Sequence, residues 1–325
     1  MKLLIPGGAG YIGSHMVRFA QEAGHEVTVL DNFSTGHCWA VTNCETIEVD
    51  LLDQNKLFQS LDGKYFDGVI HFAAKSLVSE SVHRPEVYYR NNVTGTLNLV
   101  NAMQRIGVNN LVFSSTAAIF GKPLDAKIAE DHPKNPINPY GRSKLMVENV
   151  LEDISSANDL NVTCLRYFNA AGAHVSGEIG EAHTPETHLI PNVFKAICSN
   201  ENLKVFGSDY STPDGTCIRD YVHVTDLARA HLLSIEHMKQ NAGFSVFNLG
   251  NGDGFSVLEV IKSCEHVTNL SISYETDVRR AGDPASLLAD SRKAKEILGW
   301  DGKFGCLDRI VTTAFKWHKT NMGNS

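Results

Sequence analysis

The 325-residue sequence contains no apolar run long enough to cross a bilayer and no secretory signal pattern. Its seven cysteines show no Cys-x-x-Cys spacing, which indicates reduced thiols rather than a disulfide framework or a zinc site. Fourteen histidines form no His-Glu-x-x-His or similar pattern, so no metal is expected. A formal net charge of -8 argues against a nucleic-acid surface. These absences predict a cytoplasmic protein without membrane or nucleic-acid partners.

Short apolar segments alternate with helical patterns along the first half of the chain. They lie at residues 3–5, 27–30, 46–49, 68–72, 110–113 and 162–167. This alternation predicts an α/β fold with a doubly wound parallel sheet covered by helices on both faces. Two longer helices are expected, at about 85–106 and 140–155.

The pattern loosens after Phe168, where glycine, proline and polar residues dominate from 170 to 191. A length of 325 residues is enough for two domains. We therefore predict a dinucleotide-binding domain at 1–168 and a smaller C-terminal α/β substrate lobe at 169–325. The apolar segment 244–249 reads as another buried strand, so the region near 216–250 is expected to return to the first domain.

The first expected strand leads into a glycine-rich turn and then an apolar-periodic helix. The turn is Gly7-Gly8-Ala9-Gly10-Tyr11-Ile12-Gly13. In a dinucleotide-binding unit, Gly7 permits the tight turn, Gly10 lets the backbone approach a pyrophosphate, and Gly13 allows close packing of helix on strand. The second strand ends at Asp31, whose carboxylate can bond the ribose hydroxyls and would repel a 2′-phosphate. The pattern favours NAD over NADP.

Tyr140 and Lys144 lie four residues apart at the start of an expected helix, so they share one helix face. An ammonium beside a phenol is expected to lower the pKa of the phenol and allow it to act as a general base. Upstream, a strand at 110–113 is followed by the hydroxyl run Ser114-Ser115-Thr116. In a doubly wound sheet such a run faces the ligand site.

The order of these motifs resembles the extended short-chain dehydrogenase/reductase family. Further motifs narrow the resemblance to the UDP-glucose 4-epimerases within it. They are GGAGYIGSH at 7–15, DNFSTG at 31–36, HFAAKS at 71–76, YYRNN at 88–92, RYFNAAGA at 166–173, DGTCIRDYVHV at 214–224 and RRAGDP at 279–284.

The resemblance implies a role for each matching residue. Thr116, Tyr140 and Lys144 would be catalytic. The NAD contacts would be Gly7, Gly10, Tyr11, Ile12, Gly13, Asp31, Asn32, Asp50, Leu51, Phe72, Ala73, Lys75, Asn92, Ser114, Tyr140, Lys144 and Tyr167. The UDP-sugar contacts would be Lys75, Thr116, Tyr140, Asn169, His188, Leu189, Phe206, Arg219, Arg280 and Asp283.

The resemblance also implies a reaction. Tyr140 would remove the proton of the sugar 4-hydroxyl while tightly bound NAD takes the hydride from C4, and return of the hydride to the opposite face of the 4-keto sugar would invert C4. UDP-glucose and UDP-galactose would interconvert, and a homodimer formed through the two long helices is expected. Leu287, of intermediate bulk, predicts slower turnover of UDP-N-acetyl sugars.

Two other functions are considered. Nucleotide-sugar 4,6-dehydratases resemble this chain but carry Asp-Glu directly after the threonine, where this sequence has Ala117 and Ala118. The missing carboxylates argue against elimination and against the related decarboxylases. A regulatory protein that binds NAD without chemistry would commonly lose Tyr140 or Lys144, and this chain keeps both.

Overall fold

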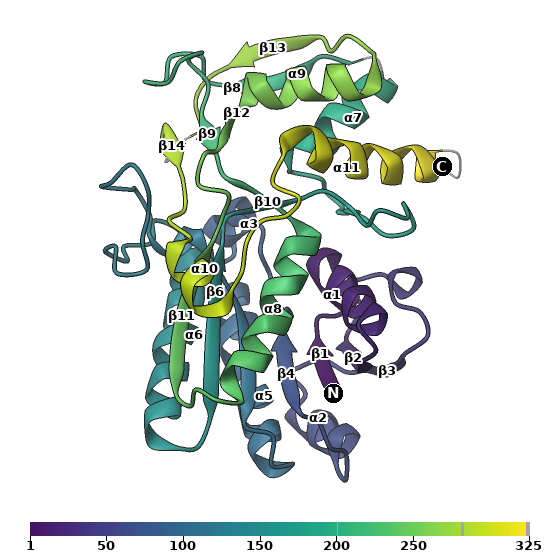
Figure 1. Cartoon of the computed structure of the whole chain (residues 1–325), viewed down its shortest axis with the longest axis vertical. Helices are drawn as coiled ribbons and strands as arrows, with labels where there is room; N and C mark the ends of the chain where they lie inside the picture. The colour runs from purple at the N-terminus through teal and green to yellow at the C-terminus, as the bar shows by residue number, and fades with distance from the viewer. Residues whose placement is uncertain (200, 281–282, 323–325) are drawn as a thin grey trace.

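The computed structural model describes residues 1–199, 201–280 and 283–322. A large layered unit carries a smaller lobe at one end (Figure 1). The large unit is built on a seven-stranded sheet in which every neighbouring pair is parallel, as predicted. Its spatial order is β11 (Phe244–Leu249), β6 (Asn161–Tyr167), β5 (Asn110–Thr116), β4 (Gly68–His71), β1 (Lys2–Pro6), β2 (Glu26–Asp31) and β3 (Glu45–Glu48).

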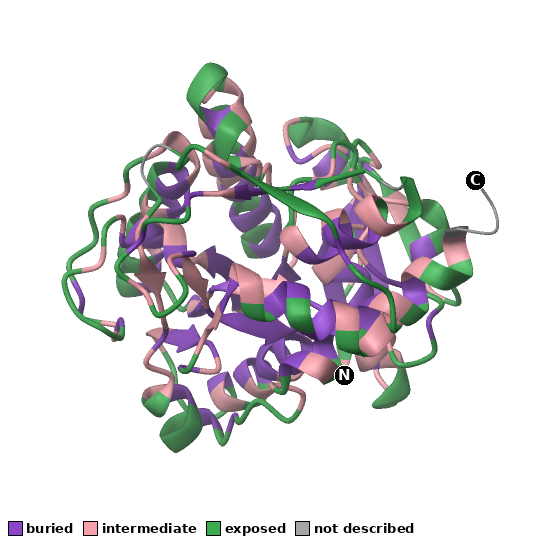
Figure 2. Cartoon of the chain, turned by 90° about the horizontal axis from the view of Figure 1, so that it is seen from above, coloured by how far each residue is buried: buried purple, intermediate pink, exposed green. Residues whose placement is uncertain are grey.

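Helices cover both faces of this sheet because successive strand residues point to opposite sides. Leu3 and Ile5 join the core beneath α1 (Tyr11–Glu22) and α8 (Val224–Met238). Leu4 joins the core on the other face, under α2 (Gln54–Leu61), α5 (Gly95–Arg105) and α6 (Pro139–Ala157). Figure 2 shows the buried strands between helices whose outer sides are exposed. Burial on both faces explains why these strands read as continuous apolar runs.

The expected helix at 85–106 is wrong in its middle. The chain forms α4 (Pro85–Tyr88), a wider π-helical segment η2 (Tyr89–Thr94) and then α5. Asn92 lies in this π-helical segment with its side chain buried, and its amide donates to the Lys75 carbonyl at 3.0 Å and to the Ser143 hydroxyl at 3.0 Å. Such segments often occur at functional sites.

Helix α6 begins where its sequence predicts. The Asn138 side chain accepts a hydrogen bond from the Gly141 N–H at 2.8 Å, and Pro139 occupies the first turn. Both features favour a helix N-terminus here. The cap places Tyr140 in the first turn of α6, within hydrogen-bond reach of Thr116 at the carboxyl end of β5.

The smaller lobe has its own apolar core, which includes Val193, Phe194, Val205, Ile261 and Ile310. Its elements are α7 (Leu189–Ser199), β8 (Leu203–Phe206), α9 (Val257–Thr268), β13 (Tyr274–Asp277) and α11 (Leu307–Met322). The remaining short elements are η1 (Cys38–Ala40), α3 (Val78–His83), η3 (Ala117–Ile119), β7 (Asn169–Ala171), β9 (Ile218–Arg219), β10 (Tyr221–His223), β12 (Phe255–Ser256), β14 (Ser286–Leu287) and α10 (Arg292–Leu298). Within the described ranges, no helix is both long and apolar enough to cross a membrane.

Candidate active site

The glycine loop between β1 and α1 requires glycine at two positions. Gly7 has φ +78°, and a Cβ atom there would lie 2.3 Å from the Ala73 nitrogen. A Cβ atom on Gly13 would lie 2.2 Å from the Gly7 carbonyl oxygen. Gly10 begins α1 without a side-chain cap, so the first N–H groups of the helix have no acceptor from the helix itself. Together these features form a cradle that fits a dinucleotide pyrophosphate.

Three polar residues meet beyond the ends of β2 and β3. The Asp31 carboxylate accepts hydrogen bonds from the N–H groups of Ala9 and Phe33, each at 2.9 Å. Burial raises the pKa of Asp31, and these backbone hydrogen bonds partly offset the increase. The Asn32 amide donates to the Asp50 carboxylate at 2.8 Å. The structure thus places Asp31, Asn32 and Asp50 together beside the glycine loop, and the next residue, Leu51, is buried.

The loop after β4 is fastened to the glycine loop. The N–H groups of Phe72 and Ala73 both donate to the Pro6 carbonyl, at 2.7 and 3.0 Å. The Lys75 N–H donates to the Asn92 side chain at 2.9 Å. The predicted residues Phe72, Ala73, Lys75 and Asn92 therefore form one continuous wall next to the cradle.

The predicted acid–base residues Tyr140 and Lys144 lie at the carboxyl end of β5. Lys144 is buried and its Nζ donates to the Ser114 carbonyl at 2.8 Å. Burial lowers the pKa of Lys144 to about 7. Burial raises the pKa of the partly buried Tyr140 phenol, and a hydrogen bond with Thr116 lowers it by a smaller amount. The expectation that the pKa of Tyr140 lies below that of a free phenol is wrong in this structure, because burial raises this pKa by more than the Thr116 hydrogen bond lowers it.

The structure contains a buried ion pair close to Lys144 that the sequence analysis does not predict. The Arg166 guanidinium on β6 meets the Glu148 carboxylate at 2.7 Å, and both side chains are at most 3% exposed. The Ser115 hydroxyl on β5 donates to the same carboxylate. Glu148 lies one helical turn after Lys144, so the sequence could have shown only that a carboxylate shares the helix face of Lys144. The pair ties α6 to two strands and holds Tyr140 and Lys144 in place.

His231 on α8 is a third residue to which the sequence analysis gives no role. Its Nε2 atom lies 3.3 Å from the Ser114 hydroxyl, and its ring centroid lies 4.6 Å from that of Phe72 and 6.1 Å from that of Tyr167. Its Nδ1 atom lies 2.7 Å from the Leu227 carbonyl oxygen, which places the ring proton on Nδ1. Nε2 is then the acceptor that orients the Ser114 hydroxyl.

The predicted UDP-sugar contacts in the lobe form two pairs. Arg219 on β9 reaches the Asp283 carboxylate at 3.5 Å and donates to the Pro284 carbonyl at 3.0 Å. The Arg280 guanidinium lies over the Phe206 ring, 4.1 Å from its centroid. Ala281 and Gly282, in the middle of the RRAGDP motif, lie outside the described residues.

The buried carboxylate of Asp220 holds together the backbone segments around Arg219 and Leu287. It accepts hydrogen bonds from the N–H groups of Asn251, Gly252 and Ala289, at 2.6, 2.9 and 3.0 Å. The Asn169 N–H donates to the Asp220 carbonyl at 2.9 Å. Leu287 pairs with Arg219 in the small sheet and packs, partly buried, against the cluster that contains Ala117. Asn169, Arg219 and Leu287 are thereby brought to one side of the site.

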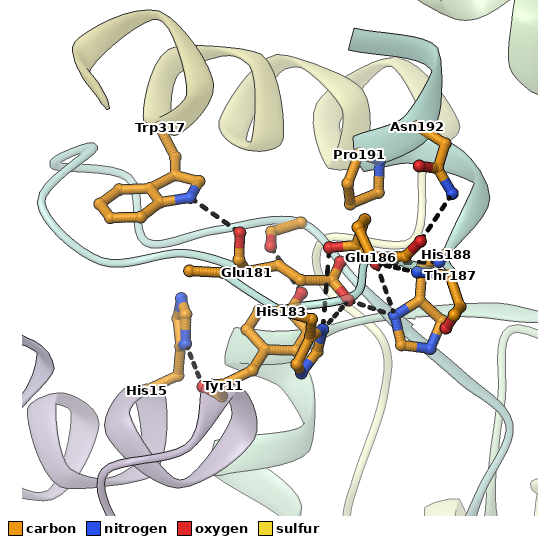
Figure 3. A network of polar contacts seen from close by, with 12 residues as sticks. Tyr11, His15, Glu181, His183, Glu186, Thr187, His188, Pro191, Asn192 and Trp317 are labelled. Carbon is orange, nitrogen blue, oxygen red and sulfur yellow. Dashed lines mark hydrogen bonds and ion pairs between the residues drawn. The ribbon is translucent and has the colours of Figure 1, made fainter. Parts of the chain in front are cut away.

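His188 and Leu189 lie at the entrance to α7. Leu189 is the first residue of that helix. The His188 side chain is half-exposed, and its Nδ1 atom contacts the Glu181 carboxylate (Figure 3). The structure therefore groups His188 with a neighbouring loop network rather than with the Arg219 and Arg280 pairs.

Comparison with known proteins gives concordant matches. Residues 3–250 match the model of the NAD dependent epimerase/dehydratase family. The chain is 50% identical to the UDP-glucose 4-epimerase of Halalkalibacterium halodurans over 98% of this chain and 96% of that protein. A crystal structure of UDP-glucose 4-epimerase from Brucella ovis in complex with NAD superposes with a TM-score of 0.94 at 46% identity, covering 97% of this chain and 98% of that one.

A second solved structure, UDP-glucose 4-epimerase from Bifidobacterium longum in complex with NAD⁺ and UDP, has a TM-score of 0.94 at 36% identity and covers 100% of both chains. The resemblance drawn from the sequence motifs is therefore confirmed. The match runs through the glycine cradle, the Tyr140–Lys144 helix and the lobe alike, because the aligned regions span nearly the whole chain. The chain belongs to the NAD dependent epimerase/dehydratase family, in which the UDP-glucose 4-epimerases are its near relatives.

Proposed function

We infer that the chain is an NAD-dependent isomerase that interconverts UDP-glucose and UDP-galactose by inversion at C4 through a 4-keto sugar. The observation that carries this inference is the placement of Tyr140, Thr116 and Lys144 at the carboxyl end of β5, in the sheet whose first strand leads into the glycine cradle. Relatives that match the chain over nearly their full length are UDP-glucose 4-epimerases.

The cofactor is held by the sheet unit. The glycine loop and the N-terminus of α1 bind the pyrophosphate, and Asp31, Asn32 and Asp50 bind the adenosine side. When bound, NAD accepts the hydride from C4 of the sugar and returns it. Lys144 and the wall formed by Phe72, Ala73, Lys75 and Asn92 complete the cofactor site.

Tyr140 is the acid–base group. Its phenolate takes the proton of the 4-hydroxyl as the keto sugar forms, and its phenol gives the proton back to the 4-oxygen in the second half of the reaction. Burial raises the pKa of Tyr140 and favours the neutral phenol, while the Thr116 hydrogen bond favours the phenolate needed in the first half by a smaller amount.

The lobe holds the nucleotide while the keto sugar rotates to present its opposite face. Arg219 and Arg280 supply guanidinium forks suited to a diphosphate, and Phe206, already paired with Arg280, offers a ring face to uracil. Asn169, His188, Leu189 and Asp283 complete the proposed UDP-sugar contacts. On this proposal 1–168 is the NAD domain and 169–325 mainly the substrate lobe, with α8 and β11 returned to the sheet.

The dehydratase alternative finds no support in the site. The two positions after Thr116 are Ala117, which is buried, and Ala118, whose N–H donates to the Thr116 hydroxyl. Neither supplies the acid that loss of water from C5 and C6 requires. A binding protein without chemistry is disfavoured because the buried Lys144 and the Glu148–Arg166 pair behind it keep the acid–base helix in position.

We also propose a cytoplasmic homodimer that pairs α5 and α6 of two chains. Apolar side chains gather where these helices meet, among them the half-buried Val93, Leu97 and Val150, and Met146 on α6 is 45% exposed. Light scattering at micromolar concentration should give about twice the 35.6 kDa chain mass. A particle of 35.6 kDa would contradict this interface.

The deciding experiment is a coupled assay that follows formation of UDP-glucose from UDP-galactose. Tyr140→Phe should retain the fold and bound NAD and lose about 10²–10⁴-fold in turnover, the range of general acid–base catalysis. Tyr274→Phe, a change of the same kind at a 46%-exposed tyrosine on β13, is the matched control and should keep wild-type turnover. Turnover of Tyr140→Phe within about threefold of wild type would refute the assignment.

A further inference from the structure

Four side chains converge in the loop that leads into α7. Glu181, His183, Glu186 and His188 each present one ligand atom, and these atoms lie within 4.8 Å of one another (Figure 3). The spacing Glu-x-His-x-x-Glu-x-His matches none of the usual metal-binding patterns, so the sequence predicts no metal here. The grouping arises from the folding of the loop.

The separations suit a small tetrahedral cation. His183 Nδ1 lies 3.1 Å from Glu181 Oε1 and 3.8 Å from Glu186 Oε2, and His188 Nδ1 lies 3.5 Å from Glu186 Oε1. Ligands about 2.1 Å from a tetrahedral Zn²⁺ stand about 3.4 Å apart, within this range. His188 Nδ1 and Glu181 Oε1 are in direct contact, and a cation would separate these two atoms.

Charge also favours a cation. The carboxylate side chains of Glu181 and Glu186 are only 7% and 2% exposed, yet they lie together. Their only ion pairs in the described parts of the chain are with His183 and His188, which are charged only when protonated. Imidazoles bind a metal in the neutral form, so with both histidines as ligands the two carboxylates would leave a charge of -2, which one divalent cation would cancel.

His183 adds a second observation. Its Nδ1 atom is buried and lies near a carboxylate oxygen of both Glu181 and Glu186, but neither contact has the full geometry of a hydrogen bond. A buried ring nitrogen that faces two carboxylates can bind a shared cation through its lone pair.

We propose that Glu181, His183, Glu186 and His188 form a structural zinc site. Two imidazole nitrogens and two carboxylate oxygens are a ligand set that Zn²⁺ accepts in tetrahedral geometry, and four protein ligands leave no open position for chemistry. The site is therefore structural and distinct from the acid–base group at Tyr140.

The position of the site defines its role. The Tyr11 ring of α1 packs edge-on against His183, with centroids 6.1 Å apart, and Trp317 of α11 donates to the Glu181 carbonyl at 3.1 Å. A cation would hold the loop between the helix that begins the cofactor cradle and the helix that closes the lobe. Binding through Nδ1 of His188 would also keep the proton on Nε2, which makes that atom a permanent hydrogen-bond donor.

The test uses the untagged full-length protein, stripped with a chelator and then titrated with ZnCl₂. Inductively coupled plasma mass spectrometry should find about one zinc per chain after excess metal is removed. His183→Gln and His188→Gln should each weaken zinc binding, measured by competition with a chromophoric chelator, by at least about tenfold. Zinc should also raise the melting temperature of the stripped wild type.

The matched control is His266→Gln, which alters an exposed histidine that meets one carboxylate, Asp308, at 3.1 Å. This variant should bind zinc as wild type does. His188 is half-exposed, so its replacement tests the site even if His183→Gln fails to fold. A wild type that holds less than about half an equivalent of zinc, or His188→Gln binding as tightly as wild type, would overturn the proposal.

Discussion

Replacement of Glu148 by glutamine should destabilise the chain more than any surface change on α6. Glu148 receives four charge-assisted or hydroxyl hydrogen bonds, three from Arg166 and one from Ser115, and the Arg166 and Glu148 side chains are at most 3% exposed. Glutamine keeps the shape and one acceptor oxygen but removes the charge. The Arg166 guanidinium then remains buried without a counter-ion.

The magnitude follows from that uncompensated charge. Removing one partner of a buried ion pair costs about 3–5 kcal/mol. An unfolding entropy of about 2.1 cal/mol/K per residue over 325 residues converts this cost to a fall of about 4–7 °C in Tm. The Arg166→Met variant should lose a similar amount, and the double variant should lose less than the sum because no unpaired charge remains.

Calorimetry and urea unfolding measure the effect, with Glu152→Gln as the control. Glu152 lies one turn further along α6 and is exposed, so its replacement should change stability by less than about 0.5 kcal/mol. If Glu148→Gln is no less stable than Glu152→Gln, the ion pair does not stabilise the fold. If the double variant loses the full sum of the two single losses, the charges of Glu148 and Arg166 act independently, which also contradicts the prediction.

Three further predictions concern the cofactor and sugar sites. Asp31→Asn should weaken NAD binding and narrow the preference over NADP, because the repulsion of a 2′-phosphate is lost; fluorescence titration showing an unchanged NAD/NADP ratio would contradict this. Lys144 has a pKa of about 7 when folded and about 10.4 when unfolded, so the free energy of unfolding should rise from pH 7 to 10 in wild type and not in Lys144→Met; parallel urea-midpoint profiles would disprove it. Leu287→Ser should raise the ratio of UDP-N-acetyl-sugar to plain UDP-sugar turnover, whereas lower stability with an unchanged ratio would make Leu287 a packing residue only.

The sequence predicts the sheet well because its strands are buried on both faces and read as apolar runs, as at Leu3 to Ile5. The glycine turn is equally legible, since Gly7 and Gly13 have no room for a Cβ atom. The pairing of Glu148 with Arg166 is not, because a same-face carboxylate on a helix says nothing of a strand residue 18 positions away.

The π-helical segment at Asn92 also escaped prediction, because a helical pattern does not reveal an extra residue in one turn. The predicted direction of the pKa shift of Tyr140 was wrong for a related reason. The spacing of Tyr140 and Lys144 along α6 can be read from the sequence, but the burial of each group depends on how α6 packs against the strands. Properties set by tertiary burial are the ones that local patterns miss.

The carboxylate of Asp220 connects parts of the chain that are far apart in sequence. It closes one loop of 31 residues to Asn251 and another of 69 residues to Ala289, so one side chain staples three distant stretches of sequence. All three donors are backbone N–H groups, which any residue except proline supplies. The contact therefore depends on the carboxylate at position 220 and on the course of the backbone at 251, 252 and 289, not on the side chains at those three positions. Loss of the Asp220 carboxylate would release three backbone segments at once, whereas a side-chain change at any one of the donors would leave the acceptor in place.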